Sequence, residues 1–259
     1  MQFLRQIACL SLLFLISCQP TVSQFMDQCM TPAERLHGME KIANDASDVL
    51  TDSHTKHWLD SGTLIGAYRF SSHMPYDDDV DFGLLRSDFE TNKNEIKQKL
   101  LLKGYSLFEN SDHSYQVHSI DNPNNGHVDL FLFEPFPGKE GYLKLSSKYW
   151  HERAAYAGYE AGFPRDIIFH PDGSLQEIYL LGKIFHAPVN IDAYLKRWYN
   201  EPNILTNFMM TQTHGGGVCS HKVRIKDIRE DPKSLKKMFD HLEKVYEGRF
   251  KRSDSRLAS

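Results

Sequence analysis

Four carboxylates crowd into five consecutive positions of the chain, where residues 77–81 read Asp-Asp-Asp-Val-Asp. Like charges this close raise one another's energy unless water or a cation neutralises them. A solvated acidic loop is one interpretation, but it fits poorly because the run continues directly into the apolar Phe82 and Leu84. On a strand, Asp79 and Asp81 point the same way, about 7 Å apart. Two carboxylates in that arrangement can hold a hard divalent cation such as Mg²⁺.

A third acid stands alone in an otherwise apolar segment. Residues 127–133 read His-Val-Asp-Leu-Phe-Leu-Phe, with Asp129 as the single carboxylate. A carboxylate inside a central strand is costly unless it is paired or bound to a metal. We therefore expect a neighbouring strand to present Asp129 to the same cation. The alternative is a hydrogen bond to nearby backbone or to His127.

A turn that suits an anion precedes the acidic run. Residues 60–69 read Asp-Ser-Gly-Thr-Leu-Ile-Gly-Ala-Tyr-Arg, the pattern of a strand end, a Gly-Thr turn and a helix start. Free N–H groups and the dipole at a helix start favour a phosphate. The Thr63 hydroxyl and the Arg69 guanidinium would add hydrogen bonds. The order of phosphate turn, paired acids and third acid is more informative than any one of the three.

Hydrophobic periodicity and turn residues indicate the elements that must position these groups. Thr31 and Glu34 form a capping-box pattern before an apolar helical repeat. Ser87 and Asn190 are expected to cap two later helices. We expect helices over 33–51, 63–68, 87–103, 191–199 and 232–248, a weakly helical stretch over 148–161, strands over 57–60, 80–84, 105–108, 115–120 and 127–133, and loop and strand pieces over 163–170 and 177–188.

Composition sets the class of protein. The chain has 259 residues, of which 41% are hydrophobic and 25% charged, as in an ordinary globular protein. A net charge of −4 gives no support for a nucleic-acid partner. Neither a repeat nor a linker divides the chain, so we expect one domain over residues 25–259. Its class is α/β (α+β), with helices flanking a mixed sheet and a helical appendage at the C-terminus.

The first 24 residues resemble a secretory signal peptide. Arg5 precedes an uncharged apolar run over residues 7–17, which is too short for a comfortable bilayer span. A short signal-anchor and a lipid anchor at Cys18 are the alternatives. The expected location is the secretory pathway, in the ER or Golgi lumen or outside the cell, with membrane contact only through an N-terminal anchor.

Three further groups are weaker candidates for a role. Cys29 and Cys219 can form a disulfide in an oxidising compartment, with two buried thiols as the alternative. His214, Cys219 and His221 lack the second ligand pair of an ordinary zinc site. The bases that alternate over residues 222–226 suit a solvated edge strand better than a site for a phosphorylated acceptor.

In this order, the three features resemble the nucleotidyltransferase fold. More narrowly, they are similar to the LicD family of phosphocholine and ribitol-phosphate transferases, which includes fukutin and fukutin-related proteins. The resemblance spans about residues 35–200. It depends on residues 62–69, 75–81 and 127–131, with looser matches at 188–190 and 194–199. Tyr76 and Asn200 depart from the family's usual Trp and Gly.

The resemblance implies a metal-dependent phosphotransferase. It would move a phospho-alcohol, such as phosphocholine or ribitol phosphate, from a CDP-linked donor to a hydroxyl of a glycan or glycoconjugate. By matching position, Asp79, Asp81 and Asp129 would hold Mg²⁺ or Mn²⁺, and Asp129 would also accept the proton of the acceptor hydroxyl.

The remaining motif residues have supporting roles under this resemblance. Gly62, Thr63 and Arg69 would position the donor phosphates. Asp77 and Asp78 would bind a second ion, hold the acceptor or orient the turn. The rival classes are a catalytically idle LicD-like secreted binding protein and a Ca²⁺-binding extracellular module. The retained acids argue against the first, and the absence of EF-hand spacing argues against the second.

Overall fold

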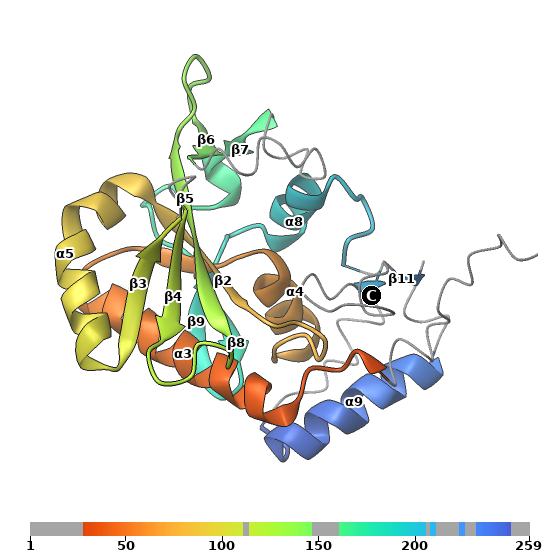
Figure 1. Cartoon of the computed structure of the whole chain (residues 1–259). Helices are drawn as coiled ribbons and strands as arrows, with labels where there is room; N and C mark the ends of the chain where they lie inside the picture. The colour runs from red at the N-terminus through yellow and green to blue at the C-terminus, as the bar shows by residue number, and fades with distance from the viewer. Residues whose placement is uncertain are drawn as a thin grey trace, which may run out of the picture.

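A mixed β-sheet forms the centre of the molecule (Figure 1). The computed structural model describes residues 28–110, 114–146, 161–205, 208–210, 223–225 and 232–249. The strand order is β1-β2-β5-β4-β3, and β6 joins the sheet between β5 and β7. β2 and β5 run parallel, and the other described pairs of this sheet are antiparallel. The strands are β1 (His57–Leu59), β2 (Val80–Leu85), β3 (Tyr105–Glu109), β4 (Tyr115–Ser119), β5 (His127–Pro135), β6 (Tyr142–Leu145) and β7 (Phe163–Pro164).

The described α-helices agree with the expected ones in place and kind, whereas a short 3₁₀ helix lies in the segment 163–170 that was expected to be loop and strand. Two antiparallel hairpins, β8 (Gln176–Leu180) with β9 (Lys183–Ala187) and β10 (Phe208–Met210) with β11 (Val223–Ile225), lie outside the main sheet. The helices are α3 (Ala33–Asp52), α4 (Ser61–Phe70), α5 (Arg86–Leu102), the short 3₁₀ helix η1 (Arg165–Ile167), α8 (Ile191–Tyr199) and α9 (Pro232–Tyr246).

The two faces of the sheet have different partners. Ala46 and Leu50 of α3 and Ile96 and Leu100 of α5 meet Val117 and Leu130 on one face. On the opposite face Trp198 of α8 packs against the rings of Phe131 and Phe133, with centroids 5.7 Å and 6.4 Å away. This period-two alternation follows from the strand pleat. The mixed α/β class expected from the sequence is therefore confirmed.

Two of the three predicted caps are wrong. Asn190 does cap α8, because its side chain accepts a hydrogen bond from the Ala193 N–H at 3.0 Å. Thr31 is not in a capping box: its hydroxyl donates instead to the Asp77 carbonyl at 2.5 Å. Ser87 lies inside α5, which begins at Arg86. In both cases a tertiary contact or an earlier helix start overrides the local pattern.

Helix α9, near the C-terminus, packs against the start of α3 (Figure 1). The Tyr246 hydroxyl donates to the Leu36 carbonyl at 3.2 Å, and His241 Nε2 lies 3.0 Å from the Thr31 carbonyl oxygen. Thr31 in turn donates its N–H to the Pro75 carbonyl at 2.8 Å. α9 therefore supports, through Thr31, the loop that carries the acidic run.

Several sequence expectations fall on residues outside the described part. They are the leader over 1–24, the helical stretch from 148, the zinc candidates His214, Cys219 and His221, and the bases at 222 and 226. Cys29 is buried and disulfide-bonded. Every other cysteine of the chain lies outside the described residues, so the pairing with Cys219 stays a prediction. Among the helices that the structure describes, none combines the length and apolar character needed to cross a membrane.

Candidate metal centre

Two parallel strands bring acids from distant parts of the chain side by side. β2 and β5 pair with Asp81 opposite Asp129 and Val80 opposite Val128. Because side chains alternate along a strand, the two carboxylates share one face of the sheet and the two valines the other. β2 begins at Val80, so Asp79 reaches the same region from the loop before the strand.

Asp79, His127 and Asp129 form a compact set of metal-ligand atoms. One ligand atom from each lies within 4.8 Å of the other two, and His127 Nε2 is 3.6 Å from Asp129 Oδ1. Within the described residues a second such set joins Asp77, Asp78 and Asp79. Carboxylate oxygens with one imidazole nitrogen suit a divalent cation, so the donor set fits the metal that the sequence implies.

Burial and mutual repulsion shift these carboxyl groups toward the protonated form. Burial, and after it the neighbouring carboxylates, hold the pKa of Asp77 and of Asp81 well above the usual range. Burial and the Asp129 charge raise the pKa of Asp79 to about 6. A bound cation would relieve this repulsion. We call Asp77, Asp79, Asp81, Asp129 and His127 the acid cluster.

The N-terminus of α4 faces the acid cluster. The Thr63 N–H donates to Asp81 Oδ2 at 3.3 Å, and the Asp81 N–H donates to the Thr63 hydroxyl oxygen at 2.9 Å. Gly62 permits the close approach, because a Cβ there would lie 2.7 Å from Asp77 Oδ2. The helix start that was predicted to favour an anion thus already faces a carboxyl group of the protein itself, that of Asp81.

A model of the family described as LicD/FKTN/FKRP, nucleotidyltransferase domain, matches residues 54–190. The chain belongs to the LicD family. The matched segment contains the whole acid cluster together with α4, β2 and β5. The family resemblance recognised in the sequence is therefore confirmed.

Curated relatives of this LicD-family protein match over shorter segments. Ribitol 5-phosphate transferase FKRP of Homo sapiens is 25% identical over 122 residues, which cover 46% of this chain and 25% of that protein. An uncharacterized protein of Rickettsia typhi is 34% identical over 70 residues, which cover 27% of this chain and 22% of that protein. The chain thus spans a quarter or less of the length of these relatives.

Solved structures show only a loose likeness. The solution structure of the antibiotic-resistance factor ANT(2″)-Ia is 12% identical and covers 83% of this chain and 90% of its own, with a TM-score of 0.36. The c-di-GMP synthase CdnE from Capnocytophaga granulosa is 11% identical and covers 56% and 50%, with a TM-score of 0.32. The fold assignment accordingly rests on the LicD family match and on the sheet itself.

The structure does not bring Arg69 to the acid cluster of this LicD-family protein. Arg69 lies six residues along α4 from Thr63, a backbone rise of about 9 Å, and is only 2% exposed. Its guanidinium donates to the carbonyls of Leu205, at 3.2 Å, and of Ile204. Burial lowers its pKa to about 10. Arg69 therefore ties α4 to the segment after α8, and this geometry gives no support to the predicted contact with donor phosphates.

Asp60 is a buried acid that the sequence pattern did not single out. It is fully buried as the N-cap of α4, where it accepts hydrogen bonds from the Ser61 N–H at 2.6 Å and from the Tyr194 hydroxyl at 2.7 Å. Burial raises its pKa to about 7. An Asp just before a helix start is a recognisable N-cap signal, but its contact with α8 is tertiary and no local pattern contains it.

Asp129 has partners on the neighbouring strand that sequence reasoning missed. Gln116 Nε2 donates to Asp129 Oδ1 at 2.7 Å, and His118 Nε2 lies 3.1 Å from Gln116 Oε1. The rings of His118 and His127 stack with centroids 5.1 Å apart and planes 13° apart. The antiparallel register, Gln116 opposite Asp129 and His118 opposite His127, creates this arrangement. The alternation of side chains within each strand could be predicted from the sequence, but the register between β4 and β5 could not.

Asp78 differs from its neighbours in having a cationic partner. Arg35 of α3 lies 3.4 Å from Asp78 Oδ2, and the Asp78 side chain is 3% exposed. Arg35 therefore holds the turn against α3. Of the roles left open for this residue, orienting the turn is the one that this contact favours.

Cation binding to the acid cluster is expected to tighten as the pH rises. The raised pKa values of Asp77, Asp79 and Asp81 mean that a cation must displace protons at low pH. For each proton that the cation displaces, the dissociation constant falls about tenfold for each unit by which the pH rises, up to the pKa of that carboxyl group. For Asp79 this pKa is about 6. Calorimetric titration with Mn²⁺ at pH 5, 6, 7 and 8 measures this slope, and an affinity that stays constant over that range would contradict it.

The stability of the metal-free protein should change with pH in the opposite direction. A carboxyl group whose pKa is higher in the folded state favours folding when it is protonated. For Asp79 the contribution is therefore largest below pH 3.8, declines as the pH rises and is lost above about 6. Urea unfolding with and without Mn²⁺ over the same pH range provides the matched comparison.

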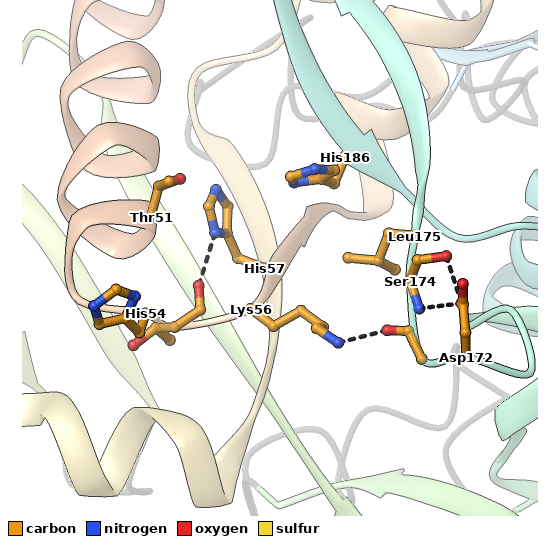
Figure 2. Close-up of a pocket in the computed structure, with 10 residues that line it drawn as sticks. Thr51, His54, Lys56, His57, Asp172, Ser174, Leu175 and His186 are labelled. Carbon is orange, nitrogen blue, oxygen red and sulfur yellow. Dashed lines mark hydrogen bonds between the residues drawn. The ribbon is translucent and has the colours of Figure 1, made fainter.

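A separate pocket lies at the other end of β1 from Asp60 (Figure 2). It encloses about 510 Å³ between the end of α3, the start of β1, the turn at 172–175 and β9. Lys56 donates to the Gly173 carbonyl at 2.5 Å, and His57 lies 3.1 Å from the Thr55 carbonyl through Nδ1. These two polar side chains are thus engaged within the pocket wall itself, and no member of the acid cluster lines it.

Proposed function

We propose that this LicD-family protein transfers a phosphorylated alcohol from a CDP-linked donor to a hydroxyl of a glycan or glycoconjugate, with Mg²⁺ or Mn²⁺ as cofactor. The observations that carry the proposal are the set of ligand atoms from Asp79, His127 and Asp129 and the strand pairing that places Asp81 opposite Asp129. These residues meet at a helix N-terminus in a family-matched segment. The likeness to a protein named ribitol 5-phosphate transferase supports the class of transferred group.

We assign the cation to Asp79, Asp81 and Asp129. When bound, it would neutralise the charge that develops on the diphosphate during transfer. Gly62 and Thr63 remain the proposed contacts for the donor phosphates, because the α4 N-terminus directs its dipole toward the cluster. Arg69 would support this contact only indirectly, by fixing α4.

Asp129 is the group we assign to proton removal. The acceptor oxygen attacks the phosphorus of the transferred group, the bond from that phosphorus to the bridging oxygen breaks, and cytidine monophosphate leaves. The hydroxyl proton passes to Asp129. Gln116 already donates a hydrogen bond to Asp129 Oδ1 at 2.7 Å. Asp129 Oδ2 is therefore the oxygen that we propose receives the proton.

A thermal-shift screen tests the donor assignment. The protein is heated with Mn²⁺ and, in turn, CDP-choline, CDP-ribitol, CDP-glycerol, CMP or CDP. We expect at least one CDP-alcohol to raise the melting temperature beyond Mn²⁺ alone, and to do so more than CMP, because only the donor offers both the diphosphate and the alcohol. If no cytidine diphosphate compound stabilises the protein, the donor assignment fails.

A Ca²⁺ arm added to this screen, together with an assay for released cytidine monophosphate, separates the rival functions. A catalytically idle binding protein would bind a donor or glycan but would not release cytidine monophosphate on incubation with both. A calcium module would be stabilised by Ca²⁺ and show no added effect of a nucleotide. The crowding of four carboxyl groups, several of them with a raised pKa, favours the enzymatic function over an idle binding site. An idle site gains nothing from holding repelling charges together.

We place the protein in the secretory pathway and treat residues 25–259 as one domain behind a leader over 1–24. The leader-like pattern of the first residues supports this location. The contacts of α9 with Thr31 and Leu36 support a domain that extends beyond the family-matched segment at both ends.

A further inference from the structure

We infer that His127 supplies a nitrogen ligand to the cation and makes the acid cluster prefer Mn²⁺ to Mg²⁺ and Ca²⁺. This inference rests on the proposed metal site and decides between the two metals left open there. It concerns a residue that the sequence offered only as a hydrogen-bond partner of Asp129.

The separation of His127 from the carboxylates is that of two ligands on one ion. Ligand atoms about 2.1–2.2 Å from a common ion lie roughly 3–4.4 Å from each other. His127 Nε2 is 3.6 Å from Asp129 Oδ1, and the set that includes Asp79 spans no more than 4.8 Å. A contact of 3.6 Å is too long for a strong hydrogen bond, so this distance fits shared coordination better than a direct bond.

Neighbouring side chains fix the orientation of the His127 ring. His118, directly opposite on β4, stacks on it with planes 13° apart. His118 is itself held near Gln116, whose amide also positions Asp129. One network of β4 side chains therefore orients both members of the proposed ligand pair, as the outer partners of metal ligands commonly do.

The mixed donor set has a consequence for metal choice. Mg²⁺ and Ca²⁺ bind almost entirely through oxygen, whereas imidazole suits transition metals. Mn²⁺ accepts carboxylate oxygens and also binds imidazole, so of these three cations it is the one that can use every atom of the set. Loss of the imidazole should weaken Mn²⁺ binding much more than Mg²⁺ binding.

Pulsed electron paramagnetic resonance of the Mn²⁺-loaded protein tests the inference directly. A coordinated imidazole nitrogen produces a ¹⁴N modulation of the Mn²⁺ echo. We expect this modulation in the native protein, its loss in His127→Phe and its retention in His118→Phe. Both variants keep an aromatic ring in the stacked pair, so they differ in which imidazole is removed. His127→Gln serves as a second variant if His127→Phe fails to fold.

Affinity provides the second measurement. We expect His127→Phe to weaken Mn²⁺ binding by about 10–100-fold and to change Mg²⁺ binding, measured by competition, by less than about threefold. Mn²⁺ binding without a ¹⁴N modulation would overturn the inference and leave an all-oxygen metal site. A modulation that persists in both His127 variants would also overturn it, because the coordinated nitrogen would then belong to another residue. Failure of the native protein to bind Mn²⁺ at all would overturn the proposed function as well.

Discussion

Asp79→Asn is expected to raise the melting temperature of the metal-free protein and at the same time to abolish its response to Mn²⁺. Asp79 belongs to both sets of potential ligands, and burial with the Asp129 charge raises its pKa to about 6. Removing the charge at pH 8 relieves the cost of burying it and the repulsion from Asp129, together worth roughly 1–3 kcal/mol. For a domain of this size that corresponds to a shift of about 2–12 °C.

The loss of cation binding should be at least about 100-fold, because Asp79 is proposed as a direct ligand and the outer partners of metal ligands alone account for 10–100-fold. Differential scanning fluorimetry with and without Mn²⁺ measures both effects. Asp121→Asn is the matched control, since Asp121 is exposed in a turn and the charge change is identical. A variant that is less stable than the native protein without metal, or one that still binds Mn²⁺ tightly, would contradict the assignment of the cluster.

Arg69→Ala is expected to lower the free energy of unfolding by about 3 kcal/mol or more. Arg69 is 2% exposed and donates to the carbonyls of Ile204 and Leu205. The substitution leaves the buried Ile204 carbonyl and the half-buried Leu205 carbonyl without their donor and opens a cavity beside α4. Urea denaturation measures the loss.

The comparison with cation affinity distinguishes a structural role from a donor-binding one. The Mn²⁺ affinity of folded Arg69→Ala should stay within about twofold of native, because the guanidinium is bound to the carbonyls of Ile204 and Leu205 and not to the acid cluster. Arg86→Ala is the control: its side chain is 41% exposed, so its ion pairs should contribute less than about 1 kcal/mol. Unchanged stability together with lost binding of CDP-alcohols would restore the phosphate role that the sequence predicted for Arg69.

The parts of the fold that local patterns determine were predictable. The apolar repeat of α3 and the alternation of β2 and β5 gave elements of the right kind within a few residues of their true ends. The proximity of the acidic run to the lone Asp129 was predictable, because both are costly to bury without a shared cation.

What could not be predicted depends on which elements become neighbours. The cross-strand register that sets Gln116 beside Asp129 is a property of two strands together. The burial of Arg69 under residues after α8 is invisible within the helix that carries it. Thr31 has the composition of a cap, but the Asp77 carbonyl competes successfully for its hydroxyl.

The contacts of Thr31 bear on where this protein can be cut. A fragment trimmed to the family-matched residues 54–190 would keep every carboxylate of the acid cluster. It would lose both Thr31, which bonds Pro75 and Asp77, and His241, which meets Thr31 from α9. The loop bearing Asp77 and Asp79 would then lose its contacts with the N-terminal Thr31 and, through Thr31, its support from α9. Boundaries drawn by sequence similarity thus fall inside the unit that holds the acids in place.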